Sequence, residues 1–349
     1  MTTTPVPAGD HLSAPVPAAG AGSSEHNLHA WWPRLRRWAI PAFGVLVLGL
    51  LLSHAHKIDW AGAWQSLKSY PPLLLLAALG FATASHVLYG VFDLIGRRHT
   101  GHDLPWWRTW AIAVASYAFN LNLGSLVGGV ALRARLYARA GLDEASIAQV
   151  VGISLATNWL GYGLLAGSLF ATGVVSPPRQ AGMSNAVFHA IGVAMILLAI
   201  FYVAACAIWR GREWHVRGRH LQLPSPVVAI FQLAVSATNW ALMGGAMYLL
   251  LRGEVSYGTT LAVLMTASIV GVVMPIPGGL GVLEAVYLAM LSGSVKQGAL
   301  MGAVMAYRAL YYIVPLAGGL VLYGLLEKYA SSHPPAASAA TSPAAYPAS

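Results

Sequence analysis

Two charged side chains, Glu284 and Arg308, stand in apolar sequence that is otherwise free of charge. Glu284 follows residues 275–281, which read PIPGGLG, and Arg308 lies within the uncharged run 297–326. Prolines and glycines at this density end one helix and turn the chain, so the bare N–H groups of the next helix point toward the turn. Such helix ends bind anions, and the planar fork of an arginine binds a carboxylate or a phosphate through two hydrogen bonds. The chemistry indicated here is therefore the binding of charged groups.

The sequence leaves two interpretations of Glu284 and Arg308 open. In the first they are structural, because Glu284 caps the helix that it begins and forms the ion pair that a buried guanidinium needs. In the second they form a transport site, where Arg308 holds a phosphate while Glu284 attracts a cationic amine or a coupling proton. The hypothesised substrate-binding residues of this part of the chain are Arg308, Glu284, Gly278, Gly279, Gly281, Pro275 and Pro277.

A second interruption lies at residues 120–129, which read NLNLGSLVGG, and it also carries polar side chains. We expect Asn120 and Asn122 to line a cavity, because asparagine at a helix break can bind either the freed backbone or a polar headgroup. Arg133, just beyond the break, is a further hypothesised substrate contact.

The tetrapeptide ATNW occurs twice inside apolar runs, at residues 156–159 and 237–240. Its asparagines, Asn158 and Asn239, again have two interpretations. They join neighbouring helices through hydrogen bonds worth about 0.6 to 2 kcal/mol each, or they line one central cavity as substrate contacts.

Composition places all of these residues in a lipid bilayer. Hydrophobic residues make up 57% of the chain and charged residues only 9%, against roughly 25% charged residues in soluble domains. Uncharged runs longer than the ~20 residues that span hydrocarbon occur at 69–92, 109–132, 145–178, 180–209, 221–251 and 255–283. These runs are continuously apolar rather than alternating, which predicts helices and excludes a β-barrel.

The organisation predicted is one membrane domain at residues 31–330 between disordered tails at 1–30 and 331–349, which are rich in Ala, Pro, Ser, Thr and Gly. A shorter apolar run, 38–53, is interpreted as a first anchor helix rather than as a cleaved signal peptide. Cys206 is the only cysteine, so a disulfide within the chain is excluded.

The positions of the basic residues predict the topology. Eight simple crossings would leave about as many Lys and Arg residues outside as inside, which contradicts the positive-inside rule. If each interrupted segment returns to its side of entry, fourteen basic residues lie inside and five outside, the latter being Lys57, Lys68, Arg179, Arg252 and Lys296. The fold predicted is therefore all-α and polytopic, with about six full transmembrane helices and two broken, re-entrant hairpins that suggest an inverted repeat. Both termini are predicted to be cytoplasmic.

Neither a catalytic site nor a metal site is predicted. The chain contains no HExxH, Gly-x-Ser-x-Gly or Walker motif, so we expect no enzymatic activity and no cofactor. His86 lies seven residues before Asp93 on one helix face, which would suit a proton relay. The spacing of Asp93 and Arg97, by contrast, predicts a plain surface ion pair at the membrane edge.

Four segments carry a resemblance to a known family: NLNLGSLVGGVALRARLYARAGL, SLATNWLGYGLLAG, PIPGGLGVLEAVYLAML and YRALYYIVPLAGGL. Over about residues 38–328 the chain resembles the lysylphosphatidylglycerol synthase transmembrane-region family. The resemblance implies the membrane module of enzymes that attach amino acids to phosphatidylglycerol and flip the product. It implies the translocation half without the soluble aminoacyl-transferase domain. Many relatives carry an acid where this sequence has Val130, so the headgroup handled here need not be theirs.

The function expected is phospholipid translocation, flippase-like, by an integral protein of the bacterial inner membrane that handles an anionic or aminoacylated phospholipid. Two alternatives stay open: a noncatalytic membrane partner of a lipid synthase, and a membrane-embedded transferase of lipid headgroups. The expected partners are membrane phospholipids and a lipid-synthesis enzyme. The net charge of +9 comes from arginines scattered over loops, which argues against nucleic acid.

Overall fold

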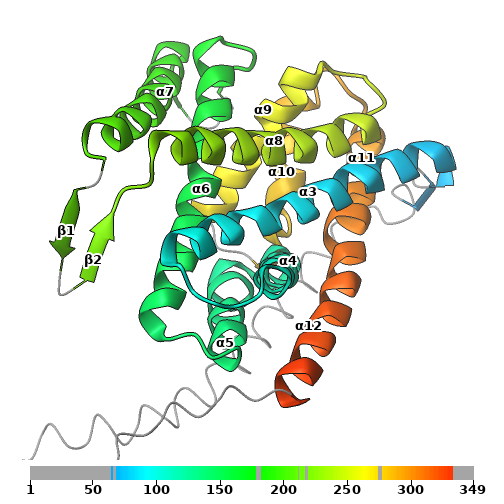
Figure 1. Cartoon of the computed structure of the whole chain (residues 1–349). Coiled ribbons are helices and arrows are strands. Elements are labelled where there is room, and N and C mark those ends of the chain that lie inside the picture. The colour runs from blue at the N-terminus through cyan, green and yellow to red at the C-terminus, as the bar shows by residue number, and fades with distance from the viewer. Residues whose placement is uncertain are drawn as a thin grey trace, which may run out of the picture. The chain divides into compact units, whose positions relative to one another are not determined.

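Helices make up most of the fold, and Figure 1 shows them in order along the chain. The computed structural model describes residues 64, 65, 68–177, 182–210, 212–216, 219–273 and 277–332. The described helices all belong to one compact unit, His56–Ser349. The predicted anchor helix at 38–53 and the predicted tail at 1–30 lie outside the described residues. The last helix runs to Ser332, and so enters the segment predicted as a tail.

Within the part of the chain that the structure describes, five helical stretches are long and apolar enough to cross a membrane. They are α3 (Pro72–Thr100), α6 (Glu144–Ala171), α7 (Asn185–Ile208), α8 (Pro226–Leu250) and the continuous stretch Gln297–Ser332. This last stretch consists of α11 (Gln297–Tyr307), the π-helical η4 (Arg308–Ile313) and α12 (Val314–Ser332). The predicted all-α polytopic fold is thereby confirmed, and the five stretches correspond to five of the six full helices predicted.

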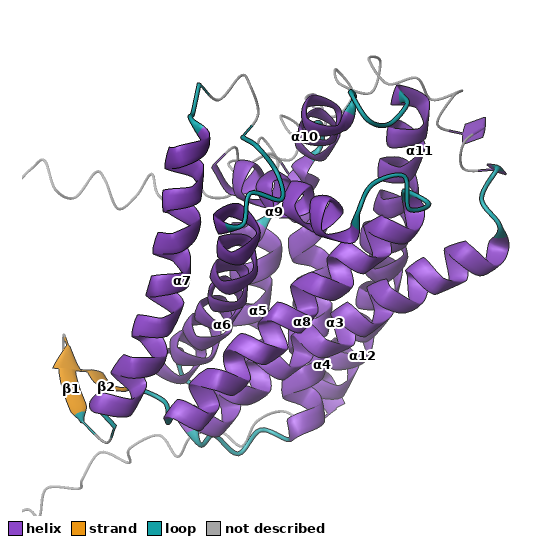
Figure 2. Cartoon of the chain, turned by 90° about the horizontal axis from the view of Figure 1, so that it is seen from above, coloured by secondary structure: helices purple, strands orange, loops and turns teal. Residues whose placement is uncertain are grey.

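A short antiparallel β-hairpin joins α7 to α8 at one end of the bundle (Figure 2). Its strands are β1 (Glu213–Val216) and β2 (Arg219–Gln222). The run predicted as helical began at residue 221, whereas α8 begins at Pro226. The Ser225 hydroxyl accepts a hydrogen bond from the N–H of Val228 at 3.4 Å, and proline fits the first helical turn because an N–H there would have no partner. Local capping chemistry thus sets this boundary.

The first interrupted segment is a helical hairpin. α4 (Trp106–Leu123) ends at Gly124, which has a φ of 86°, a backbone conformation that residues with a side chain rarely adopt. The chain then returns through the π-helical η1 (Ser125–Ala131) and α5 (Leu132–Arg139). η1 packs directly on α4, because a Cβ on Gly128 would overlap the carbonyl of Phe119. Glycine at this position therefore permits the close approach of two backbones.

The second interrupted segment is also a helical hairpin. α9 (Tyr257–Val273) is followed by the 3-10 turn η3 (Pro277–Gly279) and by α10 (Val282–Leu291), which packs back on α9. The Tyr287 hydroxyl on α10 donates to the carbonyl of Thr260 on α9 at 3.3 Å. Left-handed glycines turn the chain here, at φ angles of 65°, 55° and 80° for Gly278, Gly279 and Gly281.

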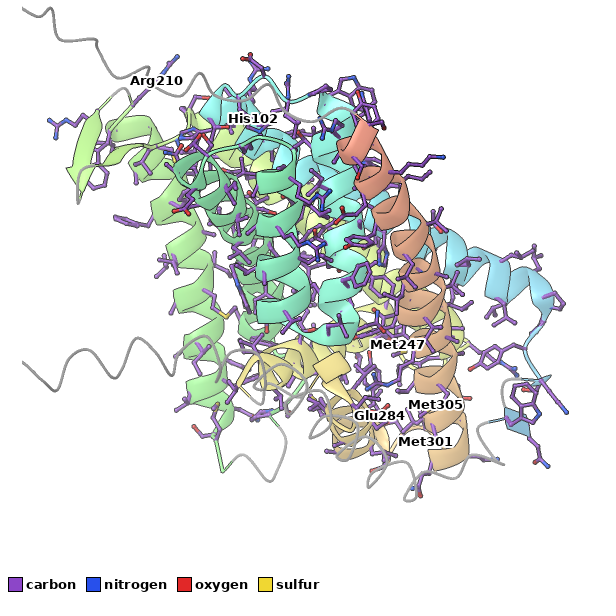
Figure 3. The ribbon with its side chains drawn as sticks, turned by 90° about the horizontal axis from the view of Figure 1, so that it is seen from below. His102, Arg210, Met247, Glu284, Met301 and Met305 are labelled. Atoms are coloured by element: carbon purple, nitrogen blue, oxygen red, sulfur yellow. The ribbon has the colours of Figure 1, made fainter. Side chains whose placement is uncertain are left out.

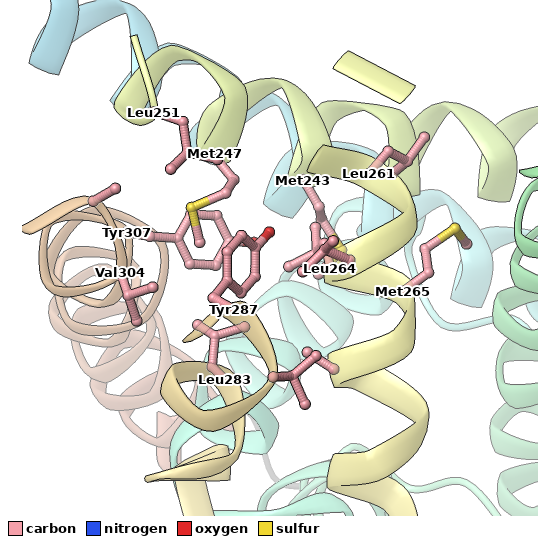
Figure 4. Close-up of a cluster of buried hydrophobic side chains, with 14 of the residues drawn as sticks. Met243, Met247, Leu251, Leu261, Leu264, Met265, Leu283, Tyr287, Val304 and Tyr307 are labelled. Atoms are coloured by element: carbon pink, nitrogen blue, oxygen red, sulfur yellow. The ribbon is translucent and has the colours of Figure 1, made fainter. Parts of the chain in front are cut away.

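An apolar cluster holds the second hairpin against its neighbours. Figure 4 shows Met243 and Met247 from α8, Leu264 from α9, Tyr287 from α10 and Tyr307 from α11 gathered in one place. All of these side chains are buried. Burial of such side chains between four helices fixes the position of α10, which is only ten residues long.

The two ends of the first hairpin lie at the same end of the bundle, beside the end of α12. The guanidinium of Arg108, near the start of α4, lies 4.9 Å from the centre of the Tyr329 ring. Arg139, at the end of α5, pairs with Glu327 at 3.1 Å. The segment thus returns to the end of the bundle from which it came.

The two ends of the second hairpin lie at the opposite end. Glu254, before α9, and Val295, after α10, line one cavity there. Figure 3 shows the two ends of the bundle, with His102 near the start of α4 at one and Met301 near the start of α11 toward the other. The turns of the two hairpins, here called their tips, meet between these two ends. A Cβ on Gly278 in η3 would lie 3.5 Å from the carbonyl oxygen of Asn122 in α4. The two hairpins thus enter the bundle from opposite ends and meet inside it.

Cysteine accessibility tests whether the first hairpin returns to its side of entry. In a Cys206→Ala background, the exposed positions of Asp103→Cys and Glu144→Cys mark the chain before α4 and after α5. We expect both to be protected from a membrane-impermeant maleimide in intact cells, because they lie at the end that the positive-inside rule makes cytoplasmic. Ser294→Cys, at the other end, should react. Labelling of one member of the first pair without the other would show that the segment crosses the membrane.

Two glycine substitutions test the turn of the second hairpin. Gly279→Ala meets no atom within 4 Å but places alanine at φ 55°, so we expect it to lower the free energy of unfolding by about 1–2 kcal/mol. Gly80→Ala, in the exposed middle of α3 and also without close neighbours, should raise it by up to about 1 kcal/mol. Thermal unfolding in detergent measures both. Equal effects would mean that η3 imposes no conformational requirement.

Candidate functional site

The guanidinium of Arg308 is hydrogen-bonded on almost every side. Nε and Nη2 donate to the two carboxylate oxygens of Glu284, at 2.5 and 2.9 Å. Nη1 donates to the carbonyl of Gly278 at 2.7 Å, and Nη2 donates to that of Gly279 at 2.8 Å. Both charged residues are buried, with exposed fractions of 5% for Glu284 and 8% for Arg308. One side chain thus binds both the turn of the second hairpin and the acid that follows it.

Local structure explains why these two charges meet. Gly281 is the N-cap of α10 and places Glu284 in the first turn, where a carboxylate also complements the helix dipole. Arg308 begins η4, a π-helical stretch between two α-helices, and such stretches occur frequently at functional sites. The guanidinium also lies 5.5 Å from the centre of the Tyr312 ring. Both partners therefore lie at irregular points of the backbone.

The segment η4 also contacts the tip of the first hairpin. Asn122, near the end of α4, donates from Nδ2 to the carbonyl of Tyr312 at 3.2 Å. The same nitrogen donates to the carbonyl of Ala118 at 2.9 Å, which fixes the side chain along its own helix. η4 therefore binds both tips, one through Arg308 and the other through the backbone of Tyr312.

In this conformation the Arg308 fork is occupied. Of the five N–H groups that a guanidinium carries, four donate to Glu284, Gly278 and Gly279. Bidentate binding of a phosphate needs two parallel N–H groups, so a phosphate can take the place of Glu284 but cannot bind beside it.

The structure gathers half of the hypothesised substrate contacts around the meeting point of the two tips: Arg308, Glu284, Gly278, Gly279, Gly281 and Asn122. The backbone of Pro277 belongs to η3, whereas Pro275 lies outside the described residues. Asn120 lies within the first hairpin, where its amide oxygen covers Gly129 of η1, 2.8 Å from the place that a Cβ would take.

The other three hypothesised contacts lie elsewhere: Arg133, Asn158 and Asn239. The backbone carbonyl of Asn158 on α6 accepts from the Ser236 hydroxyl on α8 at 3.0 Å. The side chain of Asn239 on α8 accepts from the Ser85 hydroxyl on α3 at 2.7 Å. Both copies of the repeated tetrapeptide thus take part in hydrogen bonds between helices.

Arg133 belongs to a second buried ion pair. Its Nη1 lies 3.1 Å from a carboxylate oxygen of Asp93 on α3 and donates to the Ser154 hydroxyl on α6 at 3.0 Å. The Tyr137 hydroxyl donates to the other oxygen of Asp93 at 2.7 Å. This cluster ties the returning arm of the first hairpin to two long helices, and the sequence analysis missed it.

The predicted surface ion pair between Asp93 and Arg97 is wrong. Asp93 is 0% exposed, and Arg97 instead donates from Nε to the carbonyl of Leu104 at 2.6 Å. Two side chains four residues apart on a helix can form a surface ion pair only when both are exposed to solvent, whereas Asp93 is buried in the bundle. The spacing of seven residues does place Asp93 on the same helix face as His86, and both side chains are buried.

A cavity of about 350 Å³ opens at the end of the bundle from which the second hairpin starts. Its charged lining residues are Arg252, Glu254 and Lys296. Arg252 has a φ of 53°, which is uncommon for a residue with a Cβ, and its Nη2 donates to the carbonyl and the hydroxyl of Ser69 at 2.7 and 2.8 Å. The sequence analysis used Arg252 and Lys296 only to orient the protein and did not anticipate this cavity.

Tyr70 forms one wall of this cavity and holds Arg252 in place. The guanidinium lies 4.3 Å from the centre of the Tyr70 ring. Burial raises the pKa of the Tyr70 hydroxyl, and the nearby charge of Arg252 opposes this shift only in part. The hydroxyl therefore keeps its proton and donates to the carbonyl of Leu250 at 2.6 Å.

The contribution of the buried pair Arg308–Glu284 to the free energy of unfolding can be compared with that of an exposed ion pair. Arg308→Gln leaves Glu284 buried without a counter-charge, and we expect a loss of about 3–5 kcal/mol in the free energy of unfolding. The matched change Arg135→Gln, whose guanidinium is 57% exposed in its pair with Glu327, should cost less than about 1 kcal/mol. Thermal unfolding in detergent distinguishes the two. The central pair would have no structural role if both variants melted alike.

Residues 39–319 match the family described as lysylphosphatidylglycerol synthase TM region. The chain is 38% identical over 303 residues to the inner membrane protein YbhN of Escherichia coli (strain K12), a match that covers 86% of this chain and 95% of that protein. It is 25% identical over 307 residues to the uncharacterized protein slr0712 of Synechocystis sp., which covers 85% of this chain and 94% of that protein.

A third relative is a longer protein. The chain is 22% identical over 289 residues to phosphatidylglycerol lysyltransferase of Staphylococcus haemolyticus, which covers 80% of this chain and 33% of that protein. The resemblance noted in the sequence is thus confirmed. The chain belongs to the lysylphosphatidylglycerol synthase transmembrane-region family and is a multi-pass protein of the bacterial inner membrane.

Proposed function

We propose that the protein moves phospholipids with an anionic or aminoacylated headgroup between the two leaflets of the inner membrane, as a transporter and not as an enzyme. The observation that carries this proposal is the meeting of two hairpin tips inside the bundle at Arg308. Broken helices at bilayer depth are tolerated only where protein or a wet cavity covers their backbone groups, and in transporters they commonly mark the binding site. Both termini are cytoplasmic in this proposal.

The central ion pair has the charges that such a headgroup would need. An aminoacylated phospholipid carries a phosphate, which suits Arg308, and an amine, which suits Glu284. Removal of one partner from a buried pair typically costs ~3–5 kcal/mol, so the pair stays closed while no substrate is present. A headgroup that supplies both charges can replace the pair without leaving either side chain unpaired.

The cavity at the outer end gives the headgroup a place to enter or leave. Its volume of about 350 Å³ lies within the range of small-molecule sites, which is about 300–1,000 Å³. Arg252 and Lys296 supply positive charge for a phosphate, and Glu254 supplies negative charge for an amine. One relative is named phosphatidylglycerol lysyltransferase, and this name makes phosphatidylglycerol and its lysyl ester suitable first probes.

Reconstitution tests the proposal directly. Purified protein is inserted into liposomes that contain a trace of fluorescent phosphatidylglycerol or, in a second preparation, of fluorescent lysyl-phosphatidylglycerol. Dithionite then bleaches every probe molecule that reaches the outer leaflet. We expect the wild type to expose the probe of the inner leaflet, and unlabelled lysyl-phosphatidylglycerol to compete with it. Bleaching that stops at the outer leaflet for both headgroups would contradict translocation. If translocation then appeared on co-reconstitution with a lipid synthase, the protein would be the noncatalytic partner of that enzyme.

Variants at the outer cavity separate transport from stability. We expect Arg252→Gln and Lys296→Gln to slow probe translocation several-fold while the melting temperature stays close to that of the wild type, because exposed charges contribute little to stability. Arg212→Gln, an exposed arginine near the β-hairpin at the other end, is the matched control and should leave the rate unchanged. A rate unchanged in all three variants would remove the cavity from the transport route.

A further inference from the structure

Three buried polar atoms in the middle of the bundle have no hydrogen-bond partner among the described residues: His86 Nε2, Asn239 Nδ2 and the Tyr307 hydroxyl. These residues are 4%, 0% and 0% exposed, so water from the surface does not reach them. A buried polar atom left unpaired costs about 1–3 kcal/mol, and several in one region call for an explanation.

The three residues belong to one buried cluster of polar and aromatic side chains. The Ser85 hydroxyl donates to Asn239 Oδ1 at 2.7 Å and lies 2.6 Å from the Tyr311 hydroxyl, which lies 3.1 Å from that of Tyr117. The His86 ring lies between the two tyrosines, with its centre 4.9 Å from the ring of Tyr117 and 5.0 Å from that of Tyr311. Tyr307 stacks on Tyr311 at 5.0 Å. Helices α3, α4, α8 and the α11–η4 stretch all contribute to the cluster.

The hydrogen bonding of His86 fixes which of its nitrogens is open. Nδ1 lies 2.8 Å from the carbonyl oxygen of Ala82, and a carbonyl can only accept, so Nδ1 carries the proton. In the neutral ring Nε2 then presents a bare lone pair to the cluster. Imidazole is the side chain whose ordinary titration range lies near physiological pH, so a bare Nε2 is a proton-binding atom.

We infer that His86 Nε2 is the binding site of a proton whose movement drives lipid translocation. The proton binds the Nε2 lone pair from one aqueous phase and leaves it to the other, and no other bond forms or breaks. A metal cation does not suit the site, because the described residues contain no group of three or more His, Cys, Asp or Glu side chains that could hold one. The inference rests on the proposed function for its cargo but not for the site itself.

The groups that face His86 leave the neutral ring favoured in this conformation. Tyr117 approaches from α4, Tyr311 and Tyr307 from the α11–η4 stretch, and Asn239 from α8. α6, which also packs on α3, contributes Ser154 to the neighbouring pair of Asp93 and Arg133. Asp93 of that pair lies seven residues after His86 on α3, a distance of about 10 Å along the helix. Arg308 of the central pair lies three residues before Tyr311 in η4. A proton on His86 would therefore be a buried charge without a partner until the helices move.

The segment η4 can transmit the arrival of the proton to the central pair. Tyr311, which borders the imidazole, lies three residues after Arg308 in the same π-helical stretch. An imidazolium needs an acceptor at Nε2, and the two tyrosine rings nearest to the imidazole, those of Tyr117 and Tyr311, carry hydroxyl oxygens that can accept. A change in the position of Tyr311 moves η4, and with it the guanidinium that binds both Glu284 and the turn of the second hairpin.

Nitrogen NMR tests the site without any lipid transport. Histidine-¹⁵N protein in lipid nanodiscs is titrated from about pH 8 down to about pH 4, and the His86 signal is assigned by its loss in His86→Gln. Glutamine can still donate to the Ala82 carbonyl but does not bind a proton. We expect Nε2 of His86 to gain a proton within this range in the wild type. A ring that keeps one protonation state throughout overturns the inference.

A pH gradient tests the coupling. Liposomes with fluorescent phosphatidylglycerol carry a pH difference of one unit, the membrane potential is clamped with valinomycin and potassium, and dithionite reports the ratio of probe between leaflets. With one proton per lipid we expect about a tenfold ratio at steady state, in either direction, for the wild type. His86→Gln should give a ratio of about one, because no proton then moves with the lipid. His189→Gln, at an exposed position on α7, should behave as the wild type.

The outcomes separate this inference from the proposed function. A wild-type ratio of one with intact translocation overturns proton coupling and leaves lipid transport standing. Titration of His86 without translocation of either headgroup supports the proton site and overturns the proposed cargo. If His86→Gln does not fold, Tyr311→Phe takes its place: it keeps the imidazole, removes a hydroxyl of η4 that the protonated ring could bind, and should also lower the ratio to about one. A tenfold ratio in Tyr311→Phe overturns the route through η4.

Discussion

Arg308 supplies the hydrogen bonds that the broken helix before α10 needs inside a membrane. The turn before α10 leaves the carbonyls of Gly278 and Gly279 without helical partners, and an unpaired backbone group in hydrocarbon costs several kcal/mol. The guanidinium donates to both carbonyls and to Glu284, so the acid neutralises the charge that the turn needs. Because Arg308 belongs to the long stretch from α11 to α12, the position of that stretch and the conformation of the tip depend on each other.

The first hairpin is held in a comparable way with the charges reversed. Here the returning arm supplies the cation, Arg133, and the neighbouring long helix supplies the anion, Asp93. In the second hairpin the returning arm supplies the anion, Glu284, and the neighbouring stretch supplies Arg308. Each hairpin is therefore tied by one buried ion pair to a helix that is long enough to span the membrane. Such pairs favour one register strongly, because a pair that is half broken leaves a charge unpaired.

Position along the chain predicted some contacts well and others poorly. Glycines predicted both breaks, with asparagines beside the first and prolines at the second. The count of basic residues predicted that each segment returns to its own end of the bundle, as the ends of both hairpins do. The ion pair of Glu284 with Arg308 is one of the two interpretations that the sequence leaves open for these residues. The spacing of Asp93 and Arg97 misled, because four residues along a helix define a neighbour but not whether the side chain faces protein or water. The spacing of Arg252, Glu254 and Lys296 did not predict a common cavity, because the segments that line it lie far apart in the sequence.

The sequence by itself determined what depends on composition and on local geometry: a bilayer environment, long apolar helices, the positions of the breaks and the end of the bundle at which each loop lies. Hydrophobic transfer and backbone propensities act residue by residue, so they can be read along the chain. Only the tertiary structure decided which buried charge meets which, that the tips meet at Gly278 and Asn122, and that His86 faces two tyrosines. The partners are 24 residues apart for Glu284 and Arg308 and 40 for Asp93 and Arg133. Hydrogen bonds between helices depend on packing angle and depth to within a fraction of an ångström, and the folded bundle alone fixes these quantities.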